Sequence, residues 1–180
     1  QCVIVLAEKI YIAKNKRAVI VSLARAGTPI GILIKRYLFL KYNYSAPHYT
    51  ISIVRGRGID KNAMRYILDR HSADELQFID GWTGKGAILN ELSIAVDEFI
   101  GPHEKRLLLG VLSDPANITD LCGTHDDFPI ASSFLNATVC GLMSQTIIHK
   151  SINSDQFHGV VFYNKFKSED KTYEFIEKIE

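Results

Sequence analysis

The residues best suited to chemistry lie in the stretch from Leu76 to Gly86. A short apolar run ends in one carboxylate, Asp80, and a Gly-rich turn then leads into a helical pattern that begins near Ala87. Glycines let consecutive backbone N–H groups face one concavity, and the N-terminal end of a helix adds positive potential. The pattern therefore predicts a strand, a phosphate-binding loop and a helix, with the loop formed by Gly81, Trp82, Thr83, Gly84, Lys85 and Gly86.

This loop matches neither of the common nucleotide-binding motifs. A Walker A loop has four residues between its first Gly and a Gly-Lys pair, which Ser or Thr follows. Here Gly81 and Gly84 enclose only Trp82 and Thr83, and Gly86 follows the Lys. The dinucleotide fingerprint also fails, because the acidic residue precedes the glycines. A Gly-rich turn without a ligand is the alternative interpretation.

Two further loops carry Arg and Gly at the predicted ends of strands. Arg25–Thr28 follows the apolar run Ala18–Leu23, and Arg55–Gly58 follows the strand-like run Tyr49–Val54. The carboxyl ends of parallel strands lie along one edge of an α/β sheet, where ligands bind. We therefore expect one polyanionic ligand to contact the Asp80 loop together with Arg25, Ala26, Gly27, Thr28, Arg55, Gly56 and Arg57.

The remaining chain alternates between strand-like and helical patterns. Near-continuous apolar strands between helices indicate a mainly parallel central sheet covered on both faces, a three-layer α/β/α architecture. Further strands are predicted at Leu107–Leu112 and Gly159–Tyr163. Helices are predicted over Cys2–Lys14, from Thr28 as cap to Leu40, over Ala63–His71 with Asp60 as N-cap, from Ala87 to Phe99, over Phe134–His149, and over the tail Ser168–Glu180.

Composition limits the class of protein. The chain has 180 residues, of which 47% are hydrophobic and 23% charged, and its formal net charge is +1. This fits a single domain over residues 1–180, which we expect to be part of a longer chain because it begins Gln1-Cys2. So small a net charge gives no general attraction to nucleic acid. No apolar stretch approaches the roughly 18 residues of a membrane span.

The cysteines allow a second kind of chemistry. Cys2, Cys122 and Cys140 show no C-x-x-C spacing, which argues against a disulfide framework and a zinc site and favours the reducing cytoplasm. A thiol protease needs a base beside its Cys, and either Cys122 with His125 or Cys140 with His149 could supply the pair. Packing of Cys140 in a helix is the simpler interpretation.

Several segments together resemble a known family. Asp80–Gly86 and Val21–Gly31 look like the ribose-phosphate and pyrophosphate motifs of type I phosphoribosyltransferases. More closely, the chain resembles the phosphoribosyltransferase-like family of bacterial tellurium-resistance gene clusters, whose members often carry the label cysteine protease StiP. The likeness covers nearly the whole chain and is carried by Ser22–Pro29, Arg55–Asp60, Asp80–Gly86, Ser113–Pro115, Leu135–Thr138 and Phe157–Gly159.

The resemblance implies a site for phosphoribosyl pyrophosphate and Mg²⁺, with transfer of phosphoribose to an unidentified base-like acceptor. Arg25–Thr28 would bind pyrophosphate, and Asp80 would bind the ribose and, through water or substrate, the metal. Trp82–Gly86 would bind the 5′-phosphate, and Gly123 and Thr124 would contact the acceptor. The expected catalytic residues are Asp80, Arg25 and Lys85. The type I enzymes have two adjacent acidic residues, whereas Asp80 stands between Ile79 and Gly81.

Two other functions stay open on the residues alone. One is a non-catalytic domain that senses a nucleotide or sugar phosphate, and the other is a cysteine protease. Release of pyrophosphate would separate transfer from sensing, and hydrolysis of a peptide would indicate the protease. We expect small molecules as partners, no contact with membrane or nucleic acid, and a cytoplasmic location, with a homodimer left open.

Overall fold

The computed structural model describes residues 1–127, 143–147, 155–162 and 164–179. Its centre is a five-stranded sheet in the order β2-β1-β5-β6-β7, in which every neighbouring pair is parallel. The predicted α/β class with a mainly parallel sheet is therefore confirmed. The strands are β1 (Val19–Leu23), β2 (His48–Ile51), β5 (Leu76–Trp82), β6 (Leu109–Ser113) and β7 (Cys122–Thr124).

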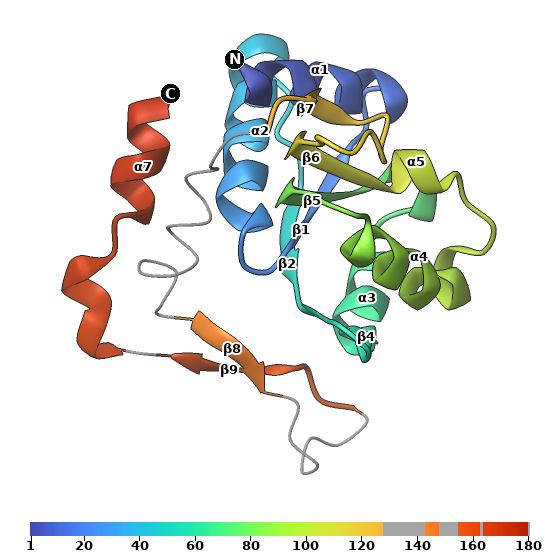
Figure 1. The fold of residues 1–180 in the computed structure, drawn as a ribbon, viewed down its shortest axis with the longest axis vertical. Coiled ribbons are helices and arrows are strands. Elements are labelled where there is room, and N and C mark those ends of the chain that lie inside the picture. The colour runs from blue at the N-terminus through green and yellow to red at the C-terminus, as the bar shows by residue number, and fades with distance from the viewer. Residues whose placement is uncertain (128–142, 148–154, 163, 180) are drawn as a thin grey trace.

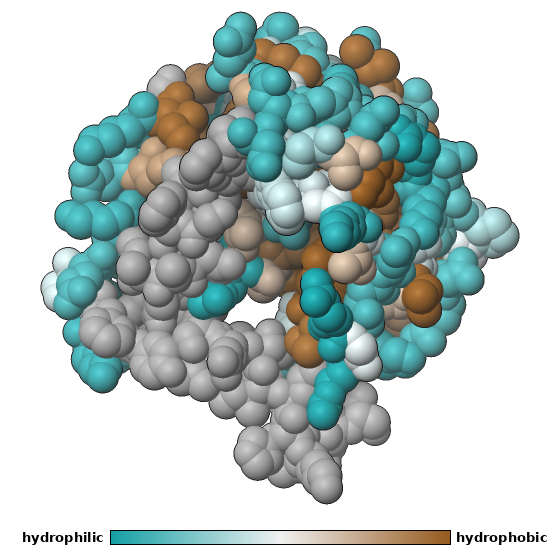
Figure 2. Space-filling model, viewed as in Figure 1, coloured by the Kyte–Doolittle hydropathy of each residue, from teal (hydrophilic) through white to brown (hydrophobic). Residues whose placement is uncertain are grey.

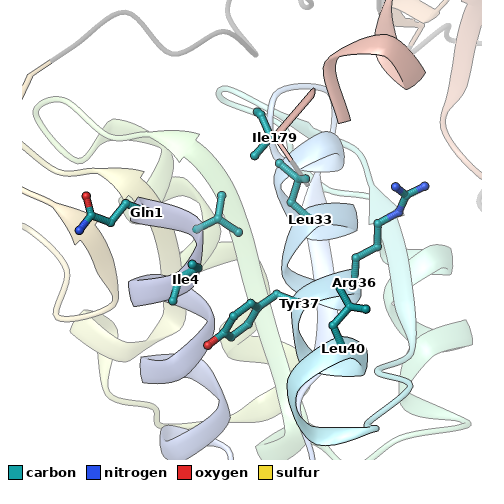
Figure 3. Close-up of a pocket in the computed structure, with 8 residues that line it drawn as sticks. Gln1, Ile4, Leu33, Arg36, Tyr37, Leu40 and Ile179 are labelled. Carbon is teal, nitrogen blue, oxygen red and sulfur yellow. The ribbon is translucent and has the colours of Figure 1, made fainter. Parts of the chain in front are cut away.

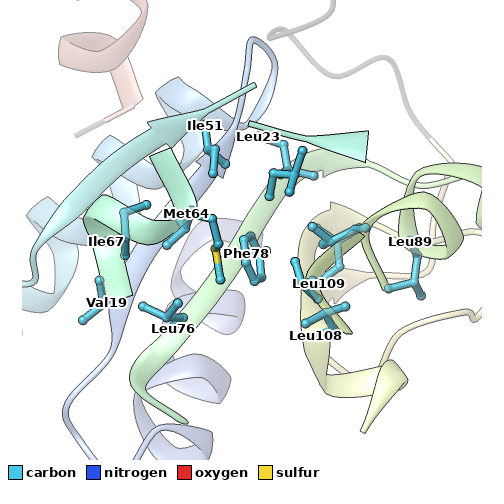
Figure 4. Packing of buried hydrophobic residues seen from close by; sticks show 14 of the residues in the cluster. Val19, Leu23, Ile51, Met64, Ile67, Leu76, Phe78, Leu89, Leu108 and Leu109 are labelled. Carbon is cyan, nitrogen blue, oxygen red and sulfur yellow. The ribbon is translucent and has the colours of Figure 1, made fainter. Parts of the chain in front are cut away.

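Helices cover both faces of this sheet (Figure 1). On one side lie α1 (Cys2–Ala13) and α2 (Gly27–Tyr42), and on the other lie α3 (Lys61–Leu68) and α4 (Ala87–Ile100). Side chains of successive strand residues point to opposite faces, so each strand contributes to two hydrophobic clusters. Phe78 packs with α3 and α4 (Figure 4), while its neighbour Ile79 packs with α1 and α2. Both side chains are fully buried.

Smaller elements surround the central sheet. β3 (Ile53–Val54) and β4 (Gly58–Ile59) form an antiparallel pair, as do β8 (Met143–Ile147) and β9 (Gly159–Phe162). Short helices precede β5, precede β6 and close the described chain, where the last of them contacts α2. Their bounds are η1 (Ala73–Glu75), α5 (Lys105–Leu108), η4 (Asn164–Glu169) and α7 (Thr172–Ile179).

The predicted elements are wrong in three details. Residues 143–147 form β8, where a helix over Phe134–His149 was expected, because they pair with β9 and a pairing partner outweighs the local pattern. β5 continues past Asp80 to Trp82, since Trp82 still pairs with Ser113 of β6. Cys122–Thr124 forms β7, a strand that was not predicted, because it pairs with β6.

The two predicted helix caps differ in outcome. Asp60 caps α3 as predicted, because its Oδ1 accepts hydrogen bonds from the backbone N–H groups of Asn62 and Ala63, both at 3.0 Å. Thr28 caps nothing: α2 already begins at Gly27, and the Thr28 hydroxyl lies 3.2 Å from that of Thr50. The hydroxyl thus links α2 to the end of β2.

The surface is mixed in character. On the face shown in Figure 2 hydrophilic residues predominate, and hydrophobic residues gather near its centre. Within the part of the chain that the structure describes, no helix combines the length and apolar character needed to cross a membrane.

Candidate functional site

The strand order puts a topological switch point between β1 and β5. Counted along the chain, the five parallel strands run 2-1-3-4-5, so the direction of the connections reverses between these two strands. Sheets of this order bind ligands outside the carboxyl ends of the strands at the point of reversal. Two predicted loops meet there: a Cβ on Gly27 would overlap the carbonyl oxygen of Ile79 and lie 3.2 Å from the Cα of Asp80. Arg25–Thr28 therefore lies directly against Asp80.

Asp80 has an unusual electrostatic environment. Its Oδ1 accepts a hydrogen bond from the N–H of Gly81 at 2.8 Å. The residue keeps some exposure, but desolvation of its carboxyl group raises its pKa from the ordinary 3.8 to about 6, against the lowering effect of that hydrogen bond. Carboxylates with a pKa raised in this way are more frequent at functional sites than elsewhere.

The Gly-rich loop is packed more closely than a free phosphate cradle. The backbone N–H of Thr83 donates to the carbonyl oxygen of Ser113 at 3.1 Å, so it is not available to a ligand. Gly84 lies against the indole of Trp82, where any Cβ would overlap the ring. Lys85 is exposed, and Gly86 has φ +77° with Ile118 next to it.

The third predicted loop is placed differently. Arg55, Gly56 and Arg57 form the exposed turn of the β3–β4 hairpin rather than the end of a central strand. The N–H of Gly58 donates to Glu91 of α4 at 3.0 Å, which fixes the hairpin on that helix. The structure thus brings the Arg25 and Asp80 loops together and puts the Arg55 loop on a separate hairpin.

A thiol, an imidazole and a carboxylate meet at the ends of β6 and β7. One ligand-type atom from each of Asp114, Cys122 and His125 lies within 4.8 Å of the others. Cys122 Sγ is 3.6 Å from His125 Nε2, and His125 Nδ1 is 2.8 Å from the main-chain oxygen of Asp114. A carbonyl oxygen only accepts, so Nδ1 carries the proton and Nε2 is the unprotonated nitrogen of the neutral ring. Sγ is also 3.9 Å from Nδ1, so the sulfur lies against the ring and not in line with the Nε2 lone pair.

The Asp114 side chain holds the connection between β6 and β7. It is fully buried, and its Oδ2 accepts from the backbone N–H groups of Ile118 at 2.7 Å and Thr119 at 2.8 Å. Its Oδ1 is buried without a hydrogen-bond partner in the residues that the structure describes. One half of this carboxylate is thus structural, and the other half is unused.

Cys122 lies level with Asp80 in the sheet. Asp80 pairs with Val111, and Val111 pairs with Cys122, so two strand spacings of about 4.8 Å separate the two backbones. Burial raises the pKa of the Cys122 thiol, although the Lys9 ammonium opposes this effect. Lys9 Nζ donates to the Cys122 carbonyl oxygen at 2.9 Å and lies 3.9 Å from Sγ. The sulfur therefore rests as a protonated thiol.

Hydrogen bonds connect the thiol site to the Gly-rich loop. The indole N–H of Trp82 donates to Asp127 at 3.2 Å, and the hydroxyl of Ser113 donates to the carbonyl oxygen of Asp126 at 2.7 Å. Both acceptors follow His125 directly, so the segment after β7 lies next to the end of β5. The thiol site and the predicted anion-binding loops share one edge of the sheet.

The sequence identified the Cys122 and His125 pair but did not connect Asp114 with it. The site depends on a turn after β7 that the sequence does not predict. In an extended strand, residues three positions apart are separated by about 10 Å. The chain must therefore bend directly after Thr124 to bring the His125 ring back to the Cys122 sulfur, and no residue pattern predicts this bend. Cys140 and His149 lie outside the described residues.

Two cavities lie apart from the thiol site. One, of about 340 Å³, adjoins the end of β1 and contains the pair Ser52 and His158, whose Oγ and Nδ1 atoms are 3.0 Å apart. The other, of about 110 Å³, lies between α1, α2 and the end of α7 (Figure 3). Its walls are Gln1, Val3, Ile4, Leu33, Arg36, Tyr37, Leu40 and Ile179.

Comparison with known proteins gives two consistent matches. A family model described as "Tellurite-like stress resistance cysteine protease StiP" matches residues 1–180. A curated protein of Acinetobacter baylyi (strain ATCC 33305 / BD413 / ADP1), named "Cysteine protease StiP", is 38% identical over 186 residues. The match covers 97% of this chain and 48% of the relative, so the chain spans about half the length of that protein.

These matches correct the predicted function. Transfer of phosphoribose, and with it the description as a phosphoribosyl-pyrophosphate-binding glycosyltransferase, is wrong, because both the family and the relative are named as cysteine proteases. The predicted Mg²⁺ site at Asp80, the loop residues and the partners stay predictions. The resemblance to a tellurium-resistance family is confirmed at the level of that family. With a family model matched over its whole length, the chain belongs to the StiP family of tellurite-like stress resistance proteins.

Proposed function

We propose that this chain carries the reactive centre of a cysteine protease, with Cys122 as nucleophile and His125 as general base. The observation that carries the proposal is the 3.6 Å separation of Sγ and Nε2 in a ring whose other nitrogen is held by the Asp114 carbonyl. A nucleophile, a base and a group that orients the base are the parts that thiol catalysis requires. The names of the family and of the relative support the same class of reaction.

The reaction follows from these atoms. Nε2 removes the proton from Sγ as the sulfur attacks the carbonyl carbon of a peptide bond. The resulting imidazolium then gives that proton to the amine nitrogen as the C–N bond breaks, which leaves a thioester on Cys122. Water, deprotonated by the same nitrogen, attacks the thioester, and the products are a carboxylic acid and the restored thiol. His125 serves each time as the proton carrier.

The proposal includes a movement of the segment after β7. Cys122 is only 2% exposed, whereas His125 and the two following residues are exposed. A peptide carbonyl reaches the sulfur only when the His125 ring or its neighbours move outward. Movement of a lid segment before chemistry is common in enzymes.

The test combines a peptidase assay with covalent labelling. The chain is incubated with fluorescently labelled casein and, separately, with a peptidyl vinyl sulfone, and the labelled cysteine is located by mass spectrometry. We expect label on Cys122, and loss of hydrolysis by at least about a hundredfold in Cys122→Ser and in His125→Gln. The matched controls Cys2→Ser and Cys140→Ser should keep both the hydrolysis of casein and the labelling of Cys122.

The controls also define failure. Equal hydrolysis by the wild-type chain and Cys122→Ser would show that the casein is cleaved by something other than this thiol. Label and activity that disappear in Cys140→Ser would move the reactive centre to that residue. Either result refutes the assignment of Cys122.

A further inference from the structure

The side chains of Asp114, Cys122 and His125 together form a set of metal ligands. Thiolate and imidazole are the ligands that Zn²⁺ and similar transition metals prefer, and a carboxylate completes many such sites. One atom from each lies within 4.8 Å of the others. The lack of C-x-x-C spacing argued against a zinc site, but here the ligands come from the end of β6 and from β7 and its following turn, which the fold brings together.

The distance between sulfur and nitrogen suits a shared metal ion. Bonds of about 2.3 Å to sulfur and about 2.05 Å to nitrogen at a tetrahedral angle put these two atoms about 3.6 Å apart. The observed distance from Sγ to Nε2 is 3.6 Å, but Sγ is also 3.9 Å from Nδ1, so the His125 ring must turn before Nε2 points at an ion bound to the sulfur. Nδ1 is 2.8 Å from the Asp114 carbonyl oxygen, so the same turn of the ring would exchange this contact for the metal.

The unused oxygen of Asp114 is an independent observation. The proposed thiol chemistry needs only the main-chain oxygen of Asp114, so it leaves Oδ1 without a role. This atom is buried and has no hydrogen-bond partner in the described residues, which is costly for a carboxylate. A cation at the neighbouring thiolate and imidazole would satisfy it. Oδ2 would keep its bonds to Ile118 and Thr119.

We propose that Asp114, Cys122 and His125 bind a single divalent transition metal ion, with Zn²⁺ as the best match to the ligand set. The exposed side of His125 leaves room for a fourth ligand from solvent. A bound ion would occupy both the sulfur and Nε2, so it would block the peptidase reaction. This inhibitory effect rests on the proposed function, whereas the binding itself does not.

The local charges allow a sharper prediction. Two of the ligands are anionic, and the Lys9 ammonium lies 3.9 Å from Sγ, where it repels a cation. Replacing Lys9 with Met removes that charge and keeps most of the apolar side chain. Lys9→Met should therefore bind the metal more tightly than the wild-type chain, by a few-fold or more. A metal held elsewhere on the surface would not respond to this change.

Co²⁺ is the probe, because its complexes with thiolates absorb light and Zn²⁺ displaces it. We expect one equivalent of Co²⁺ to give a thiolate-to-cobalt charge-transfer band and tetrahedral d–d bands, both abolished by Zn²⁺ and by Cys122→Ser. Asp114→Asn keeps an acceptor for Ile118 and Thr119 but loses the carboxylate charge, so it should weaken Co²⁺ binding at least about tenfold. The control Cys2→Ser should keep the bands.

The results distinguish this proposal from the proposed function. Bands without peptide hydrolysis in the metal-free chain would support the metal site and refute the protease. Peptide hydrolysis without these absorption bands at saturating Co²⁺ would support the protease and refute the metal site. Bands that survive in Cys122→Ser, or equal affinity in the wild-type chain and Asp114→Asn, would overturn the metal site, and circular dichroism confirms that each variant is folded.

Discussion

Asp80 illustrates how a single residue can be placed at the expense of stability. Its pKa of about 6, against an ordinary 3.8, means that folding disfavours its ionised form. The cost is absent below about pH 3.8, grows as the pH rises, and is complete above about pH 6. Asp80→Asn should therefore stabilise the chain at neutral pH by up to about 3 kcal/mol.

Urea titrations at about pH 7 and about pH 3 test this expectation. The gain of Asp80→Asn should shrink at the lower pH, where the wild-type carboxyl is protonated in both states. Asp69→Asn, at an exposed position, is the matched control and should change little. A loss of stability in Asp80→Asn at neutral pH would contradict the environment described for this carboxyl.

The lowered pKa of His48 predicts a loss of folding stability at mildly acidic pH. Burial, helped by the charge of Lys35, lowers its pKa from 6.5 to about 4, and its Nε2 lies 2.8 Å from the hydroxyl of Ser22. The unfolded chain therefore takes up a proton that the folded chain rejects. The contribution to stability is complete above about pH 6.5 and falls, by up to about 3 kcal/mol, as the pH drops towards 4.

The measurement is the free energy of unfolding between about pH 7 and about pH 4.5, compared with that of His48→Gln. The variant removes the titrating ring and should give a shallower slope over this interval. Identical slopes would show that other groups dominate the pH dependence. The comparison concerns the slope alone, because the variant also alters the contact with Ser22.

At the scale of elements, the first turn of α2 depends on a residue without a side chain. The Cβ of Ala at position 27 would overlap the Ile79 carbonyl oxygen, which belongs to the centre of the sheet and cannot move aside. Gly27→Ala should cost at least about 2 kcal/mol and displace α2 from β5. Gly56→Ala is the control: its Cβ meets nothing within 4 Å, so only the cost of φ +73°, about 1 kcal/mol, applies. Thermal unfolding of both variants measures whether Gly27→Ala is the more destabilising of the two.

The elements themselves show what the residue pattern could predict. Helices and strands with continuous apolar periodicity, such as α1 and β1, appeared where expected because burial of one face determines them. The short strands β7 and β8 were missed, since a strand of a few residues is decided by its pairing partner. The thiol site depends on β7, so its geometry could not be predicted before that pairing was known.

At the scale of the whole molecule, the hydrophobic core of the described residues is built almost entirely from the first 127 residues. Every described buried member of the two main clusters lies between Leu6 and Cys122. A chain that ends after Asp127 should therefore still unfold cooperatively. Among the described contacts, it would lose the burial of Ile176 and the hydrogen bonds that Gln156 and His158 make with Ser52, Asp60 and Asn62, at a cost of about 2–4 kcal/mol.

Circular dichroism during urea titration tests this truncation against the 180-residue chain. A single transition at lower urea concentration is the expected result. A gradual, non-cooperative change would show that residues beyond Asp127 are required to complete the core.

The group that orients His125 belongs to the polypeptide backbone. Replacement of Asp114 by any other amino acid leaves a carbonyl at the same place in the chain, so mutational scanning by substitution cannot delete this contact. For the proposed reaction, such a scan would identify the nucleophile and the base, but it would attribute any effect at Asp114 to its side chain. Insertion or removal of one residue between Asp114 and Cys122, which shifts the carbonyl relative to the ring, would reveal the backbone contact.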